Sequence, residues 1–406
     1  MTKEELGWST NKRDSIIQFD EECLLEKKNN KICFRISIKE VVFVEGNEKK
    51  LVVTYLMQNK EVYVVNTKCF HLQTTEMALD ATNALNKALN EIESRPKSAI
   101  CLVNPSSGFQ KGIKIFNSVA IPYFQASNVS FKHYITSLEG DNSIESIVSN
   151  ETFTSYDAIC LFGGDGTLRD FINHATKCKK SLPPIALIPT GTGNGLSKAL
   201  NTTYDPKVAV ANFIIGEKVD QGFHAVYEDT TKELLSYSII NVGYGFSSDT
   251  MAFQGSKLGP KKYLYTMFKG MTSAWWMSQA TFQYTEYSLD NPKDLTINED
   301  LVFKAFLMLN FPGRLKSSHK ATMKIYHDHG RLQFISKLAK DMINEGRSLI
   351  PISDSIIITP TVKSSCNEQR GHLTYQVNID GELFPFQKTI LIKLSEYTTQ
   401  MFCAKP

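Results

Sequence analysis

The stretch Ala158–Leu168, AICLFGGDGTL, constrains the fold of this chain more than any other. Five apolar residues run up to two glycines, and apolar residues then recur at helical spacing from Leu168 to Ala175. This pattern predicts a buried parallel strand, a glycine turn and an amphipathic helix. The turn would lie at the carboxyl end of the strand and at the positive end of the helix. Because glycine has no Cβ, backbone N–H groups there can approach an anion closely.

A second glycine turn follows in the same setting. The apolar run Ile185–Ile188 ends at Pro189–Gly195, PTGTGNG, and Leu196, Ala199 and Leu200 continue at helical spacing. One such turn alone can be a plain strand-to-helix connection. Two of them, joined by a right-handed crossover, come to adjacent strand ends, and this favours a phosphate site.

Three parts are expected in a chain of 406 residues. Residues 1–96 are β-rich, with a polar and charged segment at 1–30 that is frayed at its start, strands within 32–66 and one helix near 81–92. Residues 97–212 have an α/β rhythm, with strands at 99–103 and 129–135 and a short helix at 142–150. Residues 213–406 are mainly β, and a cleft beside them is the natural place for nucleotide and substrate. The predicted strands of this last part are 234–242, 280–287, 301–310, 355–361, 373–379 and 389–394.

Composition narrows the function classes. The chain is 42% hydrophobic and 21% charged, as in ordinary globular proteins, and its net charge of +3 is too small to indicate nucleic acid. The eight cysteines include no CxxC pair, so no zinc spacing is present. The first residues lack a signal peptide, and no apolar run approaches the ~18 residues that span a bilayer. We therefore expect a cytoplasmic protein that reaches any lipid substrate peripherally, at a membrane surface.

Asp165 follows the first glycine pair directly. A carboxylate is unfavourable beside a phosphate, so its presence there indicates proton or metal chemistry. Asn104 and Ser106 end the strand at 99–103, and Thr136 and Ser137 end the strand at 129–135. In an open parallel sheet these strand ends share the edge at which ligands bind.

Three motifs together resemble the diacylglycerol-kinase-type catalytic domain of sphingosine kinases, ceramide kinases and bacterial diacylglycerol kinases. They are GGDGT at 163–167, PTGTGNG at 189–195 and NPSSG at 104–108, and the resemblance extends from about Ser98 to the C-terminus. It implies a phosphofructokinase-like (Rossmann-like) α/β nucleotide lobe and a β-sandwich lipid-binding lobe, with ATP and Mg²⁺ as cofactors. The β-rich N-terminal part looks like a pleckstrin-homology module, as ceramide kinases carry there.

The resemblance also implies residue roles. Asp165 matches the aspartate that accepts the proton of the lipid hydroxyl, and Asp249 matches a substrate-contacting aspartate. Sphingosine kinases carry a second aspartate two residues further on, where this chain has Met251, and the GYGF-x-x-D form is closer to ceramide kinases. The implied nucleotide-binding residues are Asn104, Pro105, Ser106, Thr136, Ser137, Gly163, Gly164, Gly166, Thr167, Asp170, Gly191, Thr192, Gly193, Lys262, Asp380, Gly381 and Glu382.

Without the resemblance, Asp380-Gly381-Glu382 would be interpreted as a plain hairpin turn. The implied reaction is transfer of the ATP γ-phosphate to the primary hydroxyl of a sphingoid base. Ceramide kinase and diacylglycerol kinase are the alternatives within the class. Two further alternatives lie outside this class. NAD kinase, which also has a GGDGT turn, is the more remote enzyme, and a non-catalytic lipid-binding protein with a relic nucleotide site is the other.

Overall fold

The computed structural model describes residues 6–11, 15–20, 22–108, 110–245, 248, 278–286, 295–309, 321–327, 350–360 and 376–404. The chain divides into two compact units. The first consists of Met1–Gly164, Lys179–Val219 and Gln400–Pro406, and the second of Asp165–Cys178 and Asp220–Thr399. The two predicted domain boundaries, after residues 96 and 212, stay predictions.

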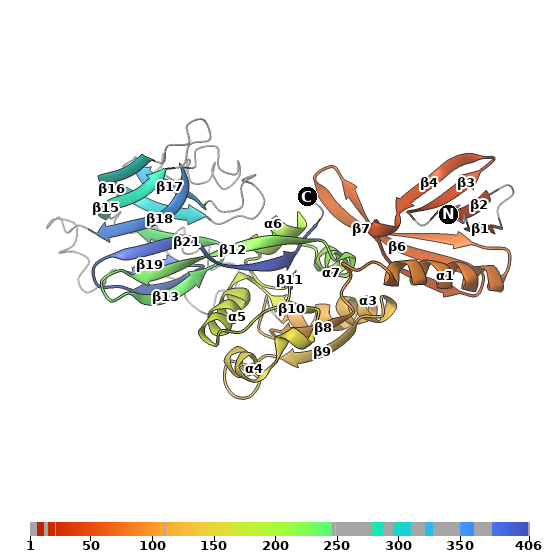
Figure 1. Cartoon of the computed structure of the whole chain (residues 1–406), viewed down its shortest axis with the longest axis horizontal. Coiled ribbons are helices and arrows are strands. Elements are labelled where there is room, and N and C mark those ends of the chain that lie inside the picture. The colour runs from red at the N-terminus through yellow and green to blue at the C-terminus, as the bar shows by residue number, and fades with distance from the viewer. Residues whose placement is uncertain are drawn as a thin grey trace. The chain divides into compact units, whose positions relative to one another are not determined.

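The first unit begins with two antiparallel sheets, β1-β2-β3-β4 and β5-β6-β7, followed by helix α1 (Figure 1). Their elements are β1 (Leu6–Ser9), β2 (Ser15–Phe19), β3 (Cys23–Lys28), β4 (Lys31–Ser37), η1 (Ile38–Glu40), β5 (Val41–Asn47), β6 (Lys50–Asn59), β7 (Val62–His71) and α1 (Thr75–Asn90). The Thr74 hydroxyl caps α1 by accepting a hydrogen bond from Met77 N at 3.1 Å. The predicted apolar stripe of this helix is confirmed, because Ala81, Leu85 and Leu89 are buried.

Strands β1 to β3 lie where the sequence predicts only a polar segment. In β2 the side chains of Ser15, Ile17 and Phe19 are buried, Ile16 is exposed and Gln18 is partly buried, an alternation only five residues long. In β4 the expected half-buried face is small, since Ile32 is 55% exposed. Two antiparallel sheets closed by one helix fit the expected arrangement, and the pleckstrin-homology assignment stays a prediction.

The rest of the first unit is a parallel α/β layer, as predicted. Its strand order is β9-β8-β10-β11, and the end of β21 (Ile390–Phe402) joins β11 in parallel through the pair Ile185 and Met401. The other elements are β8 (Ser98–Val103), α2 (Lys111–Ile115), η2 (Phe116–Ala120), α3 (Ile121–Ala126), β9 (Ser130–Ile135), α4 (Ile144–Asn150), η3 (Phe153–Ser155), β10 (Ala158–Gly163), β11 (Ile185–Pro189), α6 (Gly195–Asn201) and α7 (Pro206–Ile215). Every residue of β10 and β11 is buried, as expected for central parallel strands.

The β5–β7 sheet packs directly on this layer. Val42, Phe43 and Leu56 belong to the same hydrophobic core as Phe124 of α3 and Phe213 of α7. The Phe43 and Tyr123 rings are 5.1 Å apart in an edge-on contact. The β5–β7 sheet and the α/β layer are therefore held together by a shared apolar core.

The second unit contains helix α5 (Asp165–Lys177) and antiparallel strands. Strands β15, β16, β17 and β18 pair in a closed ring, and the others extend the sheet on either side. The remaining strands are β12 (Lys218–Glu228), β13 (Glu233–Ser238), β14 (Asn241–Gly245), β15 (Ser278–Glu286), β16 (Leu295–Leu309), β17 (Ala321–His327), β18 (Ile350–Pro360), β19 (Gln376–Ile379) and β20 (Glu382–Pro385). Among them, β12 and β17 were not predicted from the sequence.

The mainly β character of this unit is confirmed. The predicted single strand 234–242 is two strands, because the chain turns at Ile239 and Ile240. Among the described residues, none of the helices has both the length and the apolar character to span a bilayer.

Candidate functional site

The turns after β10 and β11 pack tightly on each other. The carbonyl of Gly163 accepts hydrogen bonds from Thr190 N at 3.0 Å and Gly191 N at 3.2 Å. A Cβ at Gly164 would lie 2.7 Å from the Gly193 carbonyl oxygen, and one at Gly191 would lie 2.6 Å from the Gly164 Cα. Glycine is therefore required at 164 and 191 by the contact between the turns themselves, and the predicted adjacency of the two turns is confirmed.

The turn after β8 joins the same cluster. Gly108 has a φ of +52°, and a Cβ there would lie 2.0 Å from the Thr190 carbonyl oxygen. The Ser107 and Thr190 hydroxyls are buried and 3.2 Å apart. Three consecutive strand ends of the sheet, those of β8, β10 and β11, thus form one packed set, which we call the glycine turns (104–108, 163–164 and 189–195).

Asn194 closes the third of these turns. Its Oδ1 accepts a hydrogen bond from Gly191 N at 3.0 Å, and its Nδ2 donates one to Gly191 O at 2.7 Å. The sequence analysis named Asn194 only as part of the motif. Thr192 and Gly193 are exposed beside it, so their backbone groups remain accessible.

Gly166 differs from the other glycines of its motif. Nothing in the described part of the chain lies within 4 Å of a Cβ built at this residue. It is the second residue of α5, a helix of 13 residues that begins at Asp165, directly after Gly164. The first N–H groups of a helix have no partner in the helix and attract negative charge. The space beside the Gly166 Cα is thus open, and the predicted contact of this residue with ATP stays a prediction.

The remaining predicted residues of the first unit shape the strand ends. Asn104 Oδ1 accepts from Ser106 N at 3.0 Å, which forms a turn around Pro105. Thr136 is buried and its hydroxyl donates a hydrogen bond to Val103 O at 3.3 Å. Ser137 is exposed and its hydroxyl donates a hydrogen bond to Glu139 O. Their predicted contacts with ATP stay predictions.

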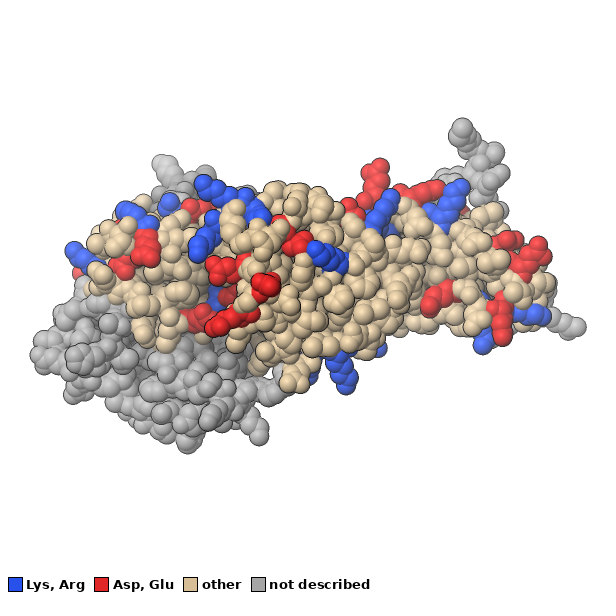
Figure 2. All heavy atoms as spheres, turned by 90° about the horizontal axis from the view of Figure 1, so that it is seen from below, with Lys and Arg blue, Asp and Glu red and all other residues tan. Residues whose placement is uncertain are grey.

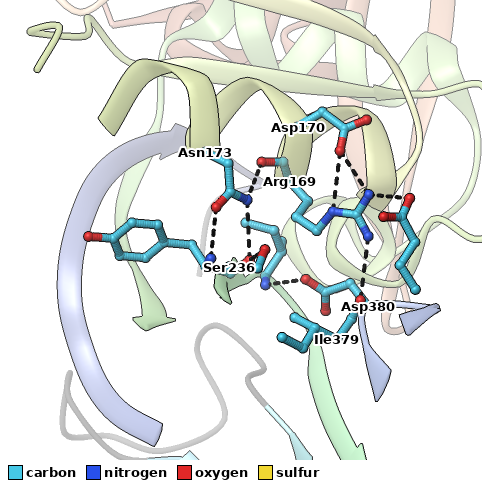
Figure 3. Close-up of polar contacts among 9 residues, drawn as sticks. Arg169, Asp170, Asn173, Ser236, Ile379 and Asp380 are labelled. Atoms are coloured by element: carbon cyan, nitrogen blue, oxygen red, sulfur yellow. Dashed lines mark hydrogen bonds and ion pairs between the residues drawn. The ribbon is translucent and has the colours of Figure 1, made fainter. Parts of the chain in front are cut away.

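In the second unit, Arg169 joins two of the predicted residues. Its side chain is 4% exposed and forms ion pairs with Asp170, at 2.8 Å, and with Glu382. Its Nη1 also donates to Ile379 O at 3.4 Å, and Figure 3 shows the guanidinium turned toward Asp170 and Ile379. Burial raises the pKa of Asp170, and the partly opposing effect of Arg169 leaves it above its usual value.

Arg169 was missed by sequence reasoning. Residues adjacent in a helix ordinarily do not face each other, so the pair Arg169-Asp170 gave no signal. Asn173, one turn further, was missed as well. Its side chain accepts from Tyr237 N at 2.9 Å and donates to Arg169 O at 2.8 Å, which fastens α5 to β13 (Figure 3).

Asp380 and Gly381 form a two-residue hairpin between β19 and β20, with φ of 51° and 91°. The Asp380 carboxylate accepts hydrogen bonds from the backbone N–H of Ile239 at 2.6 Å and of Ile240 and Asn241 at 2.8 Å. Burial raises its pKa although these hydrogen bonds oppose the shift. The structure therefore gives this carboxylate a structural task, and its nucleotide contact stays a prediction.

Asp249, Met251 and Lys262 lie outside the described residues. Within the described ranges, no group of three or more His, Cys, Asp or Glu side chains is arranged to hold a metal ion. Acidic and basic side chains are interspersed over the face seen in Figure 2, consistent with the small net charge.

Comparison with known proteins identifies the domain. Residues 98–222 match the family model of the diacylglycerol kinase catalytic domain. This confirms the resemblance predicted from the three glycine motifs.

The chain is similar to ceramide kinase from Mus musculus, at 24% identity over 229 residues that cover 52% of this chain and 42% of that protein. It is also similar to sphingosine kinase 1 from Mus musculus, at 24% identity over 169 residues that cover 38% of this chain and 43% of that protein. The matches thus span less than half the length of these relatives. Among solved structures, a diacylglycerol kinase from Bacillus anthracis aligns with a TM-score of 0.53 at 16% identity, over 76% of this chain and 98% of that one, which shows the fold.

Proposed function

We propose that this chain is an ATP-dependent lipid kinase that transfers the γ-phosphate to the primary hydroxyl of a sphingoid base, giving a sphingoid base 1-phosphate. The observation that carries the proposal is the packing of the three glycine turns at neighbouring ends of β8, β10 and β11, within a region that matches the diacylglycerol kinase catalytic domain. Such strand ends are where open α/β sheets bind their ligands.

The residues present fit a nucleotide. Exposed backbone at Thr192 and Gly193 supplies donors for phosphate oxygens. Asp165, the first residue of α5, would accept the proton of the attacking hydroxyl. Mg²⁺, when bound, would neutralise phosphate charge. It commonly uses one or two carboxylates and retains water, so the absence of a three-ligand group among the described residues does not conflict with its use.

The choice of a sphingoid base rests on the GTGNG-LSKAL stretch, which resembles long-chain-base kinases. Ceramide is the second candidate substrate, and two observations favour it. The ceramide kinase alignment covers more of this chain than the sphingosine kinase alignment does, 52% against 38%. Met251 also stands where sphingosine kinases carry an aspartate.

The test is transfer of labelled phosphate from ATP to sphingosine, phytosphingosine, ceramide and diacylglycerol, each in the same anionic vesicles, with NAD as a water-soluble acceptor. We expect the sphingoid bases to be phosphorylated fastest and the vesicles to raise activity, because the lipid is presented at a surface. Asp165→Asn, expressed and purified identically, controls for contaminating kinases.

The other outcomes of this assay would revise or overturn the proposed function. Preference for ceramide or diacylglycerol would replace the sphingoid base and keep the lipid kinase. Phosphorylation of NAD with no lipid product would overturn the lipid kinase. A wild-type rate equal to that of Asp165→Asn on every acceptor would overturn catalysis itself.

A further inference from the structure

A cavity of about 270 Å³ lies inside the first unit, between the N-terminal sheets and the α/β layer. Helix α1 and strand β5 contribute Leu89 and Phe43 to its wall, and α7 contributes Ile214. The segment that links α1 to β8 contributes Arg95, and the end of α3 contributes Ser127. The glycine turns do not line it, so the cavity is distinct from the proposed nucleotide site.

Arg95 is the chemical centre of this cavity. Its Nη1 donates to Val42 O at 3.0 Å and its Nη2 donates to Val41 O, which ties the linking segment to β5. Its Nε is buried and has no hydrogen-bond partner among the described residues. The Ser127 hydroxyl, which also lines the cavity, is buried and has no partner in that part of the chain either. Two buried donors at one cavity are thus left for a ligand.

The charge of Arg95 is also uncompensated within the described structure. None of the residues that line the cavity is acidic, and Lys97 adds a second cation. Asp157 accepts hydrogen bonds from the backbone N–H groups of Lys97 and Ser98, but it does not line the cavity. Burial lowers the pKa of Arg95 to about 10, so the guanidinium remains charged at neutral pH. A partly buried cation whose Nε is fully buried and that has no counter-charge is stabilised by an anion.

The rest of the wall is apolar. Val42, Phe43, Leu89, Val129 and Ile214 all line the cavity and are at most 7% exposed. A free inorganic anion would leave this surface without a partner. An anion that carries a short apolar chain would satisfy both parts of the wall at once.

We propose that this cavity binds a small amphiphilic anion, a phosphate monoester or carboxylate with a short apolar chain, whose charged end pairs with Arg95 Nε and Ser127 Oγ and whose chain packs on Phe43, Leu89 and Ile214. Its volume is slightly below the ~300–1,000 Å³ of common ligand pockets, so it takes a compact ligand or the head and first carbons of a lipid. Because the cavity lies between the two halves of the first unit, its occupant would hold the N-terminal sheets on the α/β layer.

The test uses the full chain and octyl phosphate as the probe, with binding measured by isothermal titration calorimetry. Inorganic phosphate and octanol test the two halves of the probe separately, and we expect each to bind at least tenfold more weakly than octyl phosphate. Arg95→Gln should weaken octyl phosphate at least tenfold. Arg35→Gln makes the same change at an exposed residue of β4 and should leave the affinity unchanged.

A second variant keeps the proposal testable if Arg95→Gln fails to fold, since Arg95 also ties the chain to β5. Ala126→Leu adds volume at the cavity wall on α3 without touching Arg95, and it should weaken octyl phosphate to a similar extent. Vesicles that contain phosphatidic acid show whether the ligand is a membrane lipid or a free amphiphile. Binding to them that depends on Arg95 assigns a membrane lipid, and binding of soluble octyl phosphate alone assigns a free amphiphile.

Three results would overturn the proposal. The first is that neither octyl phosphate nor the vesicles bind. The second is that octyl phosphate binds Arg95→Gln and Ala126→Leu as tightly as the wild type, which would place it elsewhere, for example at the glycine turns. The third is that inorganic phosphate or octanol binds as tightly as octyl phosphate.

Discussion

The glycine turns of the first unit and the β19–β20 hairpin of the second both lie at strand ends, but different forces hold them. At Gly164 and Gly191 the backbones of two turns approach so closely that only hydrogen fits where a side chain would begin. At Asp380 a buried carboxylate collects three backbone N–H groups, while the neighbouring Arg169 is shared by two carboxylates.

Close backbone packing and buried charge pairs respond differently to mutation and to pH. Close backbone packing depends on the absence of a side chain and has almost no dependence on pH. Buried charges depend on the ionisation of every partner, and each lost partner leaves an unsatisfied group in a poorly hydrated place. The first unit should therefore be sensitive to added volume at its turns, and the second to removed or titrated charge. Four experiments test this difference.

The largest expected effect is on catalysis. Asp165→Asn and Asp170→Asn make the same change at two residues of α5. Asp165→Asn should lower kcat ~10²–10⁴-fold, because it removes the proposed proton acceptor. Asp170→Asn should cost much less, because that carboxylate is paired with Arg169. Steady-state rates on the same vesicles at saturating ATP measure both, and an equal loss in the two variants would contradict the assigned roles.

The hairpin carboxylate gives the largest expected effect on stability. Asp380→Ala should lower the free energy of unfolding by about 3–5 kcal/mol, since three backbone donors lose their acceptor and a residue with positive φ loses a tolerant side chain. Asp380→Asn keeps one acceptor oxygen and should cost less. Urea denaturation measures both, and an alanine variant as stable as the wild type would show that the hairpin does not depend on this charge.

Acid should weaken the second unit through His224 of β12. This residue is 1% exposed, and burial lowers its pKa from 6.5 to about 4. Below pH 6.5 the unfolded chain takes up a proton that the folded chain does not, so stability falls until about pH 4, where the folded state is protonated as well. The loss should reach about 3 kcal/mol. Stability measured against pH should be flatter in His224→Leu, and an unchanged slope would assign the acid sensitivity to another group.

The smallest expected effects compare two glycines of one motif. Gly164→Ala should destabilise the first unit by about 1–3 kcal/mol, because its Cβ meets the Gly193 carbonyl. Gly166→Ala has free space and favours helix, so stability should stay within about 1 kcal/mol of the wild type. If Gly166 contacts ATP, the same variant should raise the KM for ATP. Thermal melts and ATP titrations separate the two, and equal destabilisation would show that both glycines serve packing.

The sequence alone determined the parallel layer and its turns. The run Ala158–Gly163 is apolar throughout because both faces of a central parallel strand are covered, and this is visible without a structure. The amphipathic character of α5 was equally predictable from the sequence, since the apolar residues that recur from Leu168 to Ala175 form its buried face. Glycine at 164 and 191 was also predictable, but for phosphate access, whereas the structure adds contact between the turns as a reason.

Only the tertiary structure decided which charges are paired and which cavities are charged. Arg169 looks like any solvated helix residue in the sequence, and its partner Glu382 is more than 200 residues away. Asp380 looked like a hairpin residue, and its carboxylate proved to hold the turn between β13 and β14. Arg95 gave no signal because its partial burial results from packing of the β5–β7 sheet on the α/β layer. Periodicity reports the face on which a residue lies, whereas charge pairing depends on which distant segments meet there.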